Sequence, residues 1–91
     1  MIRKNPVILI VEDDADIANL IAHYLQRAGH RTDVIVSGDD AIPAVQERQP
    51  DLLILDLMLP GRQGLEICRT IRRDPTLSRL PIMFVREWFL D

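Results

Sequence analysis

Three short runs of apolar residues, unbroken by polar positions, constrain the fold of this chain more than any other feature. They are VILIV at 7–11, LLIL at 52–55 and IMFV at 82–85. Unbroken apolar runs of this length are typical of parallel strands that helices cover on both faces. Parallel strands need a crossover connection, usually a helix, and the stretches between the runs are long enough to supply one. The chain is therefore predicted to be an α/β protein.

The segment 14–28 has the clearest helical periodicity. Asp14 can cap its start, and Gly29 can take the left-handed conformation after its end. Its apolar residues recur at spacings of three and four, which places them on one stripe of a helix. The predicted stripe consists of Ile17, Leu20, Ile21, Tyr24, Leu25 and Ala28.

Weaker patterns fill the interval before the second apolar run. Residues 31–36 mix polar and apolar positions, as in a strand near the edge of a sheet. Ser37 and Asp40 resemble a capping box that opens a helix ending before Pro50. Pro43 lies inside that helix and predicts a kink or a ragged first turn, because proline lacks an N–H group.

A third helix is expected at 65–73, with Leu65, Cys68 and Ile71 facing inward and Asp74-Pro75 ending it. Pro60, Gly61 and Gly64 are turn residues in the loop before it. The complete pattern, βαβαβαβ, predicts a doubly wound parallel sheet in strand order 2-1-3-4. The first helix is expected on one face of the sheet, and the second and third helices on the other.

Charge and composition exclude several classes of protein. The formal net charge is −3, with 11 basic and 14 acidic residues, which argues against a nucleic-acid-binding surface. Arg69, Arg72 and Arg73 lie close together, but acidic neighbours favour a solvated helix face. The first apolar run is too short for a signal-peptide core or a membrane span, so a cytoplasmic location is expected. Cys68, the only cysteine, allows no internal disulfide.

Acidic residues follow two of the predicted strands. The first strand ends in Glu12-Asp13-Asp14, and the third ends in Asp56. If the two strands are neighbours, these carboxylates meet at one edge of the sheet and repel one another. A hard divalent cation relieves such repulsion, and oxygen ligands suit Mg²⁺. A carboxylate beside Mg²⁺ can attack a phosphoryl group, which predicts an acyl phosphate on Asp56.

Simpler roles are possible for the same residues. Asp56 could cap the turn after its strand, and Glu12 could be solvated. Asp14 is interpreted as a helix cap rather than a metal ligand.

Four motifs in order resemble the receiver domains of two-component response regulators over nearly the whole chain. They are VEDD at 11–14, LDLMLPG at 55–61, GLE at 64–66 and LPI at 80–82. The resemblance implies a flavodoxin-like fold and a signalling domain, not an enzyme, phosphorylated by a histidine kinase or phosphotransfer protein. It makes Asp56 the phospho-acceptor. It also implies Mg²⁺ held by Asp13, by Glu12 through water, by Asp56 and by the backbone carbonyl of Met58.

The C-terminal part departs from that pattern. Receivers usually have Thr or Ser at the end of the fourth strand, where this chain has Arg86, and 86–91 form an atypical tail. Residues 1–91 are therefore interpreted as one truncated receiver domain lacking the fifth strand, with its phosphate-binding lysine, and the fifth helix. Impaired phosphorylation is expected. The uncovered strand edge and sheet face predict a homodimer, and the alternative is a monomer in which Trp88, Phe89 and Leu90 fold back over the sheet.

Two other functions fit the same residues less well. A phosphorylation-independent pseudo-receiver would keep the fold and act through protein–protein contacts alone. A phosphatase resembling haloacid dehalogenases would use Asp56 as nucleophile, but such enzymes carry a second acid two residues later, where this chain has Met58.

Overall fold

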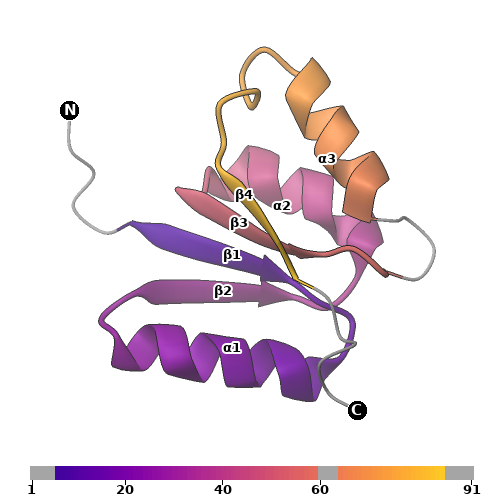
Figure 1. Ribbon diagram of the computed structural model, residues 1–91. Helices are drawn as coiled ribbons and strands as arrows, with labels where there is room; N and C mark the ends of the chain where they lie inside the picture. The colour runs from indigo at the N-terminus through magenta and orange to yellow at the C-terminus, as the bar shows by residue number, and fades with distance from the viewer. Residues whose placement is uncertain (1–5, 60–63, 86–91) are drawn as a thin grey trace.

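The fold, seen in a computed structural model, alternates strands and helices along the whole described chain (Figure 1). The structure describes residues 6–59 and 64–85. Its elements in chain order are β1 (Val7–Val11), α1 (Ala15–Arg27), β2 (Arg31–Ile35), a 3₁₀ turn η1 (Gly38–Asp40), α2 (Ala41–Arg48), β3 (Leu52–Asp56), α3 (Gly64–Arg73) and β4 (Ile82–Val85).

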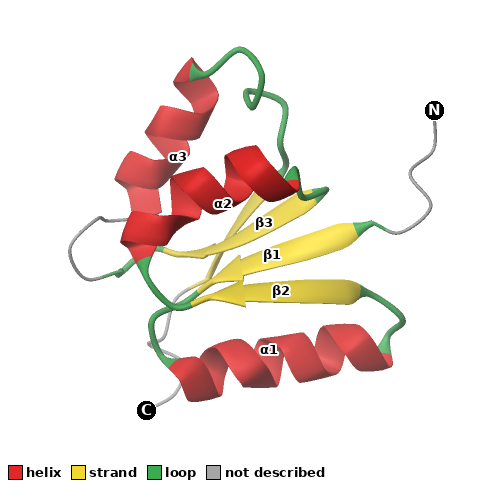
Figure 2. Ribbon diagram, turned by 180° about the vertical axis from the view of Figure 1, so that it is seen from behind, coloured by secondary structure: helices red, strands yellow, loops and turns green. Residues whose placement is uncertain are grey.

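All strand pairs in the sheet are parallel, and the order is β2-β1-β3-β4. Helix α1 lies on one face of the sheet, and α2 and α3 lie on the other (Figure 2). The predicted doubly wound architecture is confirmed, including the strand order. No helix within 6–59 or 64–85 is long and apolar enough to cross a membrane.

Strand β1 lies at the centre of the sheet and contributes to two separate cores. Leu9 and Val11 pack with residues of α2 and α3, whereas Ile8 and Ile10 pack with residues of α1. Side chains alternate between the two faces of a strand, so a strand covered on both faces must be apolar at every position. This burial explains the unbroken run VILIV.

The buried face of α1 overlaps the predicted stripe but is rotated relative to it, since Ile21 and Leu25 pack against the core on this side. Ala18 and Ala22 are buried against the sheet, whereas Leu20 and Tyr24 are 51% and 64% exposed. Small side chains let the helix backbone approach the sheet closely, so the alanines lie at the centre of the contact and Ile21 and Leu25 pack beside them. The apolar stripe exists, but its inward centre is rotated toward the alanines.

The inward face of α3 also differs from the prediction. Leu65 is 50% exposed, and Ile67 takes the inward position together with Ile71, while Cys68 is half-buried. The helix begins at Gly64, which is buried against the backbone of Asp56 and Leu57. Because this contact directs position 64 toward the sheet, the positions three and seven residues later also face inward.

The start of α2 is ragged, as Pro43 predicted. Ser37 Oγ accepts a hydrogen bond from the N–H of Asp39 at 3.3 Å, so it opens the 3₁₀ turn and not the α-helix itself. Pro43 lies in the first turn of α2, where the missing N–H group has no helical partner in any case. Strand β2 ends at Ile35, one residue earlier than predicted.

Candidate metal site at the carboxyl edge of the sheet

The pairing of β1 with β3 brings Glu12 beside Asp56. Val11 pairs with Leu55, so Glu12 and Asp56 occupy the next step of the register. Glu12 extends the strand, because its N–H donates to the carbonyl of Ile35 at 3.0 Å. Strand alternation places Glu12 on the same face as Ile10, and Asp56 on the same face as Ile54. Both acids therefore lie on the face that carries α1.

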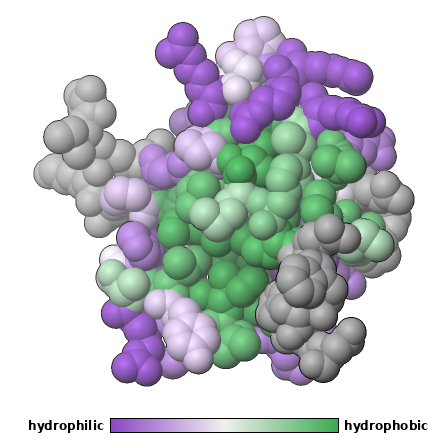
Figure 3. All heavy atoms as spheres, viewed as in Figure 1, coloured by the Kyte–Doolittle hydropathy of each residue, from purple (hydrophilic) through white to green (hydrophobic). Residues whose placement is uncertain are grey.

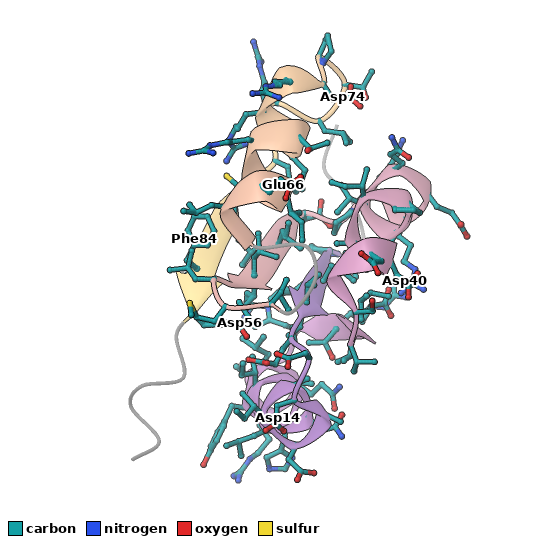
Figure 4. The ribbon with its side chains drawn as sticks, turned by 90° about the vertical axis from the view of Figure 1, so that its right-hand side faces the viewer. Asp14, Asp40, Asp56, Glu66, Asp74 and Phe84 are labelled. Carbon is teal, nitrogen blue, oxygen red and sulfur yellow. The ribbon has the colours of Figure 1, made fainter. Side chains whose placement is uncertain are left out.

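Three carboxylates meet at this edge. One oxygen from each of Glu12, Asp13 and Asp56 lies within 4.8 Å of the others. Glu12 and Asp56 are fully buried, whereas Asp13 is exposed. Figure 4 shows Asp56 at the end of the sheet and Asp14 below it, at the start of α1. The burial of Glu12 rules out the interpretation that it is a solvated surface residue.

Each buried carboxylate has one oxygen in a hydrogen bond and one without a partner. The N–H of Asp14 donates to Glu12 Oε2, and the N–H of Met58 donates to Asp56 Oδ1, both at 3.0 Å. Glu12 Oε1 and Asp56 Oδ2 are buried, and within the described residues neither has a hydrogen-bond partner. An unsatisfied buried polar atom costs about 1–3 kcal/mol.

These unpartnered oxygens fit a hard divalent cation. Carboxylate oxygens are the ligands that Mg²⁺ prefers, and the exposed Asp13 leaves one side open to ligands that water can supply. A cation would give Glu12 Oε1 and Asp56 Oδ2 the partner that the protein does not provide. The donor set of this cluster is therefore suited to Mg²⁺.

Glu12 titrates far from its ordinary range. The pKa of its carboxyl group is raised from 4.5 to about 8, chiefly by burial and also by neighbouring Asp13 and Asp56, while the hydrogen bond from the N–H of Asp14 opposes the shift. At neutral pH and without a metal, Glu12 is therefore mainly protonated. A metal requires the ionised form, so binding a cation here is coupled to release of a proton.

Asp14 performs the capping role assigned to it. Its Oδ1 accepts hydrogen bonds from the N–H groups of Asp16 at 2.9 Å and Ile17 at 3.2 Å. That carboxylate therefore completes the first turn of α1, and it is not part of the cluster. Asp13 and Asp14 are adjacent in sequence but have different tasks.

The remaining predicted site residues are Met58 and Arg86. The side chain of Met58 is 69% exposed, and its N–H group binds Asp56, which fixes the backbone next to the carboxylate. Arg86 and the rest of the tail at 86–91 lie outside the described residues. The sequence pointed to Gly64 only as a turn residue and as part of the GLE motif, whereas the structure packs it against the Asp56–Leu57 peptide.

A separate groove lies at the opposite end of the strands. It has a volume of about 490 Å³ and lies between the end of α2 and the segment leading into β4, with Gln49, Asp51, Asp74 and Arg79 in its lining. It contains none of the clustered carboxylates. The groove is therefore separate from the carboxylate cluster.

Comparison with known sequences identifies close similarity to regulatory proteins. A family model described as the response regulator receiver domain matches residues 8–88. The chain is 46% identical over 80 residues to the phosphate regulon transcriptional regulatory protein PhoB of Rhizobium meliloti. It is also 46% identical over 83 residues to the transcriptional regulatory protein BaeR of Escherichia coli O6:H1. These matches cover 88% and 91% of this chain, but the chain spans only about a third of each relative, 35% and 33%.

Solved structures share the fold. A sensor protein from Polaromonas sp. JS666 superposes with a TM-score of 0.87 at 36% identity, over 91% of this chain and 66% of that one. The BeF3-activated N-terminal receiver domain of Klebsiella pneumoniae RstA superposes with a TM-score of 0.80, also at 36% identity, over 88% of this chain and 66% of that one.

Proposed function

This chain belongs to the family of response regulator receiver domains, and we propose that it accepts a phosphoryl group on Asp56 with the help of Mg²⁺. The observation that carries the proposal is the pair of buried carboxylates, each with an unpartnered oxygen, beside the exposed Asp13. Glu12, Asp13, Asp56 and the backbone carbonyl of Met58 are the proposed metal ligands.

The proposed reaction is a phosphoryl transfer to a carboxylate oxygen. The nucleophile is an oxygen of the Asp56 carboxylate, whose Oδ1 accepts a hydrogen bond from the N–H of Met58 and whose Oδ2 has no hydrogen-bond partner among the described residues. A bond forms between a carboxylate oxygen and phosphorus, while the bond from phosphorus to the donor breaks and its electron pair leaves with the donor. Mg²⁺ bound at this edge would neutralise the charge on the phosphoryl oxygens.

The residues around Asp56 have distinct supporting tasks. Asp13 is exposed and offers a carboxylate on the side from which a donor approaches. Glu12 releases a proton when it becomes a ligand, since burial holds the pKa of its carboxyl group at about 8. The resemblance expects Thr or Ser at the position of Arg86, so that hydroxyl donor to the phosphoryl oxygens is missing and a slow reaction is expected.

The donor is proposed to be a phosphorylated histidine on a histidine kinase or phosphotransfer protein. An acyl phosphate is formed readily from a phosphorylated nitrogen, since that bond is itself labile. The relatives are named as transcriptional regulators, but this chain spans about a third of their length. We therefore assign it the receiving step alone.

Contact with a second copy is proposed on the side that carries β4. Strand β4 pairs with β3 along one edge, and within the described residues no strand pairs with its other edge. Met83 and Phe84 of this strand are 54% and 37% exposed. Figure 3 shows apolar residues gathered over this side of the molecule. This exposed surface favours a homodimer. The same surface supports the second candidate function, that of an assembly module that acts without phosphorylation.

Beryllium trifluoride tests the acceptor site without a kinase. It forms a tetrahedral adduct with a carboxylate and imitates a phosphoryl group, and the Klebsiella relative is described as activated by it. Amide shifts near Glu12, Asp13 and Met58 are expected to change when the compound is added with Mg²⁺. With Mg²⁺ already present, the compound should cause no further shift in Asp56→Asn, whereas Asp40→Asn, which alters an exposed acid near α2, should respond like the unaltered protein. Equal responses from the Asp56→Asn and unaltered proteins would contradict the proposal.

A further inference from the structure

Gly64 is the first residue of α3 and is packed against the backbone of the proposed acceptor. A methyl group at this position would collide with the carbonyl oxygen of Asp56 and lie 3.0 Å from the Cα of Leu57. The obstacle is main chain and cannot rotate away as a flexible side chain would. Glycine is therefore the only residue that permits this approach.

The Asp56–Leu57 peptide is held from three directions. The N–H of Leu57 donates to the carbonyl of Val85 at 3.2 Å, which joins the peptide to β4. The N–H of Met58 donates to Asp56 Oδ1 at 3.0 Å, which fixes the carboxylate. The start of α3 closes the third side through Gly64. If α3 moved and displaced this peptide, the Asp56 carboxylate and the Met58 backbone would both change direction.

We propose that Gly64 is a positioning residue for the Asp56 site. Its missing side chain sets how closely α3 approaches the Asp56–Leu57 peptide, and this distance fixes the direction of Asp56 Oδ2 and of the Met58 backbone. The inference rests on the proposed function, because it assigns Gly64 an effect on Mg²⁺ affinity. Groups that orient metal ligands affect affinity although they never touch the metal.

Gly29 offers a matched control. It lies after α1 with a φ of 97°, so alanine is strained there, yet a methyl group would meet nothing within 4 Å. Gly64→Ala and Gly29→Ala therefore both lower stability, but only Gly64→Ala displaces the acceptor. Mg²⁺ affinity, followed by amide shifts, is expected to fall roughly ten- to a hundredfold in Gly64→Ala. In the same variant without metal, the Met58 amide should exchange with solvent faster, and neither quantity should change in Gly29→Ala.

A second pair of variants covers the case in which Gly64→Ala does not fold. Ile67 and Ile71 are both fully buried on α3, one turn apart, and Ile67 is the nearer to Gly64. Ile67→Val loosens the first turn of the helix, so it should weaken Mg²⁺ binding more than Ile71→Val does. Equal affinities in this pair, or in Gly64→Ala and Gly29→Ala, would overturn the inference. Absence of Mg²⁺ binding in the unaltered protein would instead remove the proposed function on which the inference rests.

Discussion

At the scale of single residues, the site depends on two buried acids, and burying a carboxylate costs free energy of folding. Glu12 and Asp56 are fully enclosed, and each retains an oxygen that no described residue satisfies. Proteins tolerate such groups when the groups have a function that requires them. The neighbouring acids Asp13 and Asp14 differ from each other in task, because only Asp13 belongs to the cluster.

The first prediction separates these two neighbours. Asp13→Asn removes one charged ligand and is expected to weaken Mg²⁺ binding by tenfold or more, on the order of 1.4 kcal/mol. Asp14→Asn makes the same change in net charge, but the asparagine oxygen can still cap α1. It should leave the affinity nearly unaltered. Titration with Mg²⁺ followed by NMR measures both, and equal losses in the two variants would refute the assignment of Asp13 as a ligand.

The second prediction concerns pH. In the folded protein the pKa of Glu12 is about 8, against an ordinary value of 4.5, so between these values folding takes up a proton. The free energy of unfolding of the metal-free protein should therefore fall as pH rises from about 4.5 to about 8. The slope due to this group is up to about 1.4 kcal/mol per pH unit.

Glu12→Gln isolates that contribution, because glutamine does not titrate. Urea unfolding at several pH values should show that the stability of the original protein declines relative to the Gln variant across this window. Added Mg²⁺ should reduce the decline, because the metal stabilises the ionised carboxylate. Parallel stability curves for the two proteins would show that Glu12 does not titrate as described.

At the scale of elements, the sequence predicted which segments form helices and strands, but not how each helix is turned. Periodicity placed Leu20 on the apolar stripe of α1, yet Leu20 is 51% exposed and Ala18 is fully buried against the sheet. A hydrophobicity pattern gives most weight to large apolar residues. Close packing of a helix against a sheet instead favours small residues at the centre of the contact. The orientation of α3 depends on Gly64, whose contact with the Asp56 backbone is not visible in a hydrophobicity pattern.

The third prediction tests the orientation of α1. Ala18→Leu places a larger side chain where the helix meets the sheet, so it should lower the free energy of unfolding by about 1–3 kcal/mol. Leu20→Ala removes an exposed side chain and should change stability by roughly 0.5 kcal/mol or less. Denaturant unfolding measures both changes. If Leu20→Ala lowered the free energy of unfolding more than Ala18→Leu does, the buried face of α1 would be the one that periodicity predicted.

At the scale of the whole molecule, strand order decides both the site and the exposed surface. Because β1 and β3 are neighbours, the acids that follow them meet at one edge, as the sequence alone allowed us to expect. Because β4 is the outer strand of the described sheet, Met83 and Phe84 remain accessible. The extent to which these residues are exposed depends on packing around β4, which apolar patterning does not reveal.

The fourth prediction concerns self-association on the side that carries β4. Met83→Lys places a charge on the exposed apolar surface and should raise the dissociation constant of the proposed dimer. Val36→Lys adds the same charge at a residue that is 51% exposed, after the strand at the opposite edge of the sheet. It should leave association unaltered. Sedimentation analysis across micromolar concentrations measures both, and a monomer at every concentration of the unaltered protein would rule out the dimer.

The central claim is that Asp56 accepts a phosphoryl group, and the intact mass of the protein after incubation with acetyl phosphate tests it most directly. With Mg²⁺, the mass is expected to increase by one phosphoryl group, and fragmentation should place that group on Asp56. Chelation of the metal, Asp56→Asn and Asp13→Asn should each reduce or abolish the increase. No added mass in the Mg²⁺-loaded protein, or an equal increase in Asp56→Asn, would contradict the account.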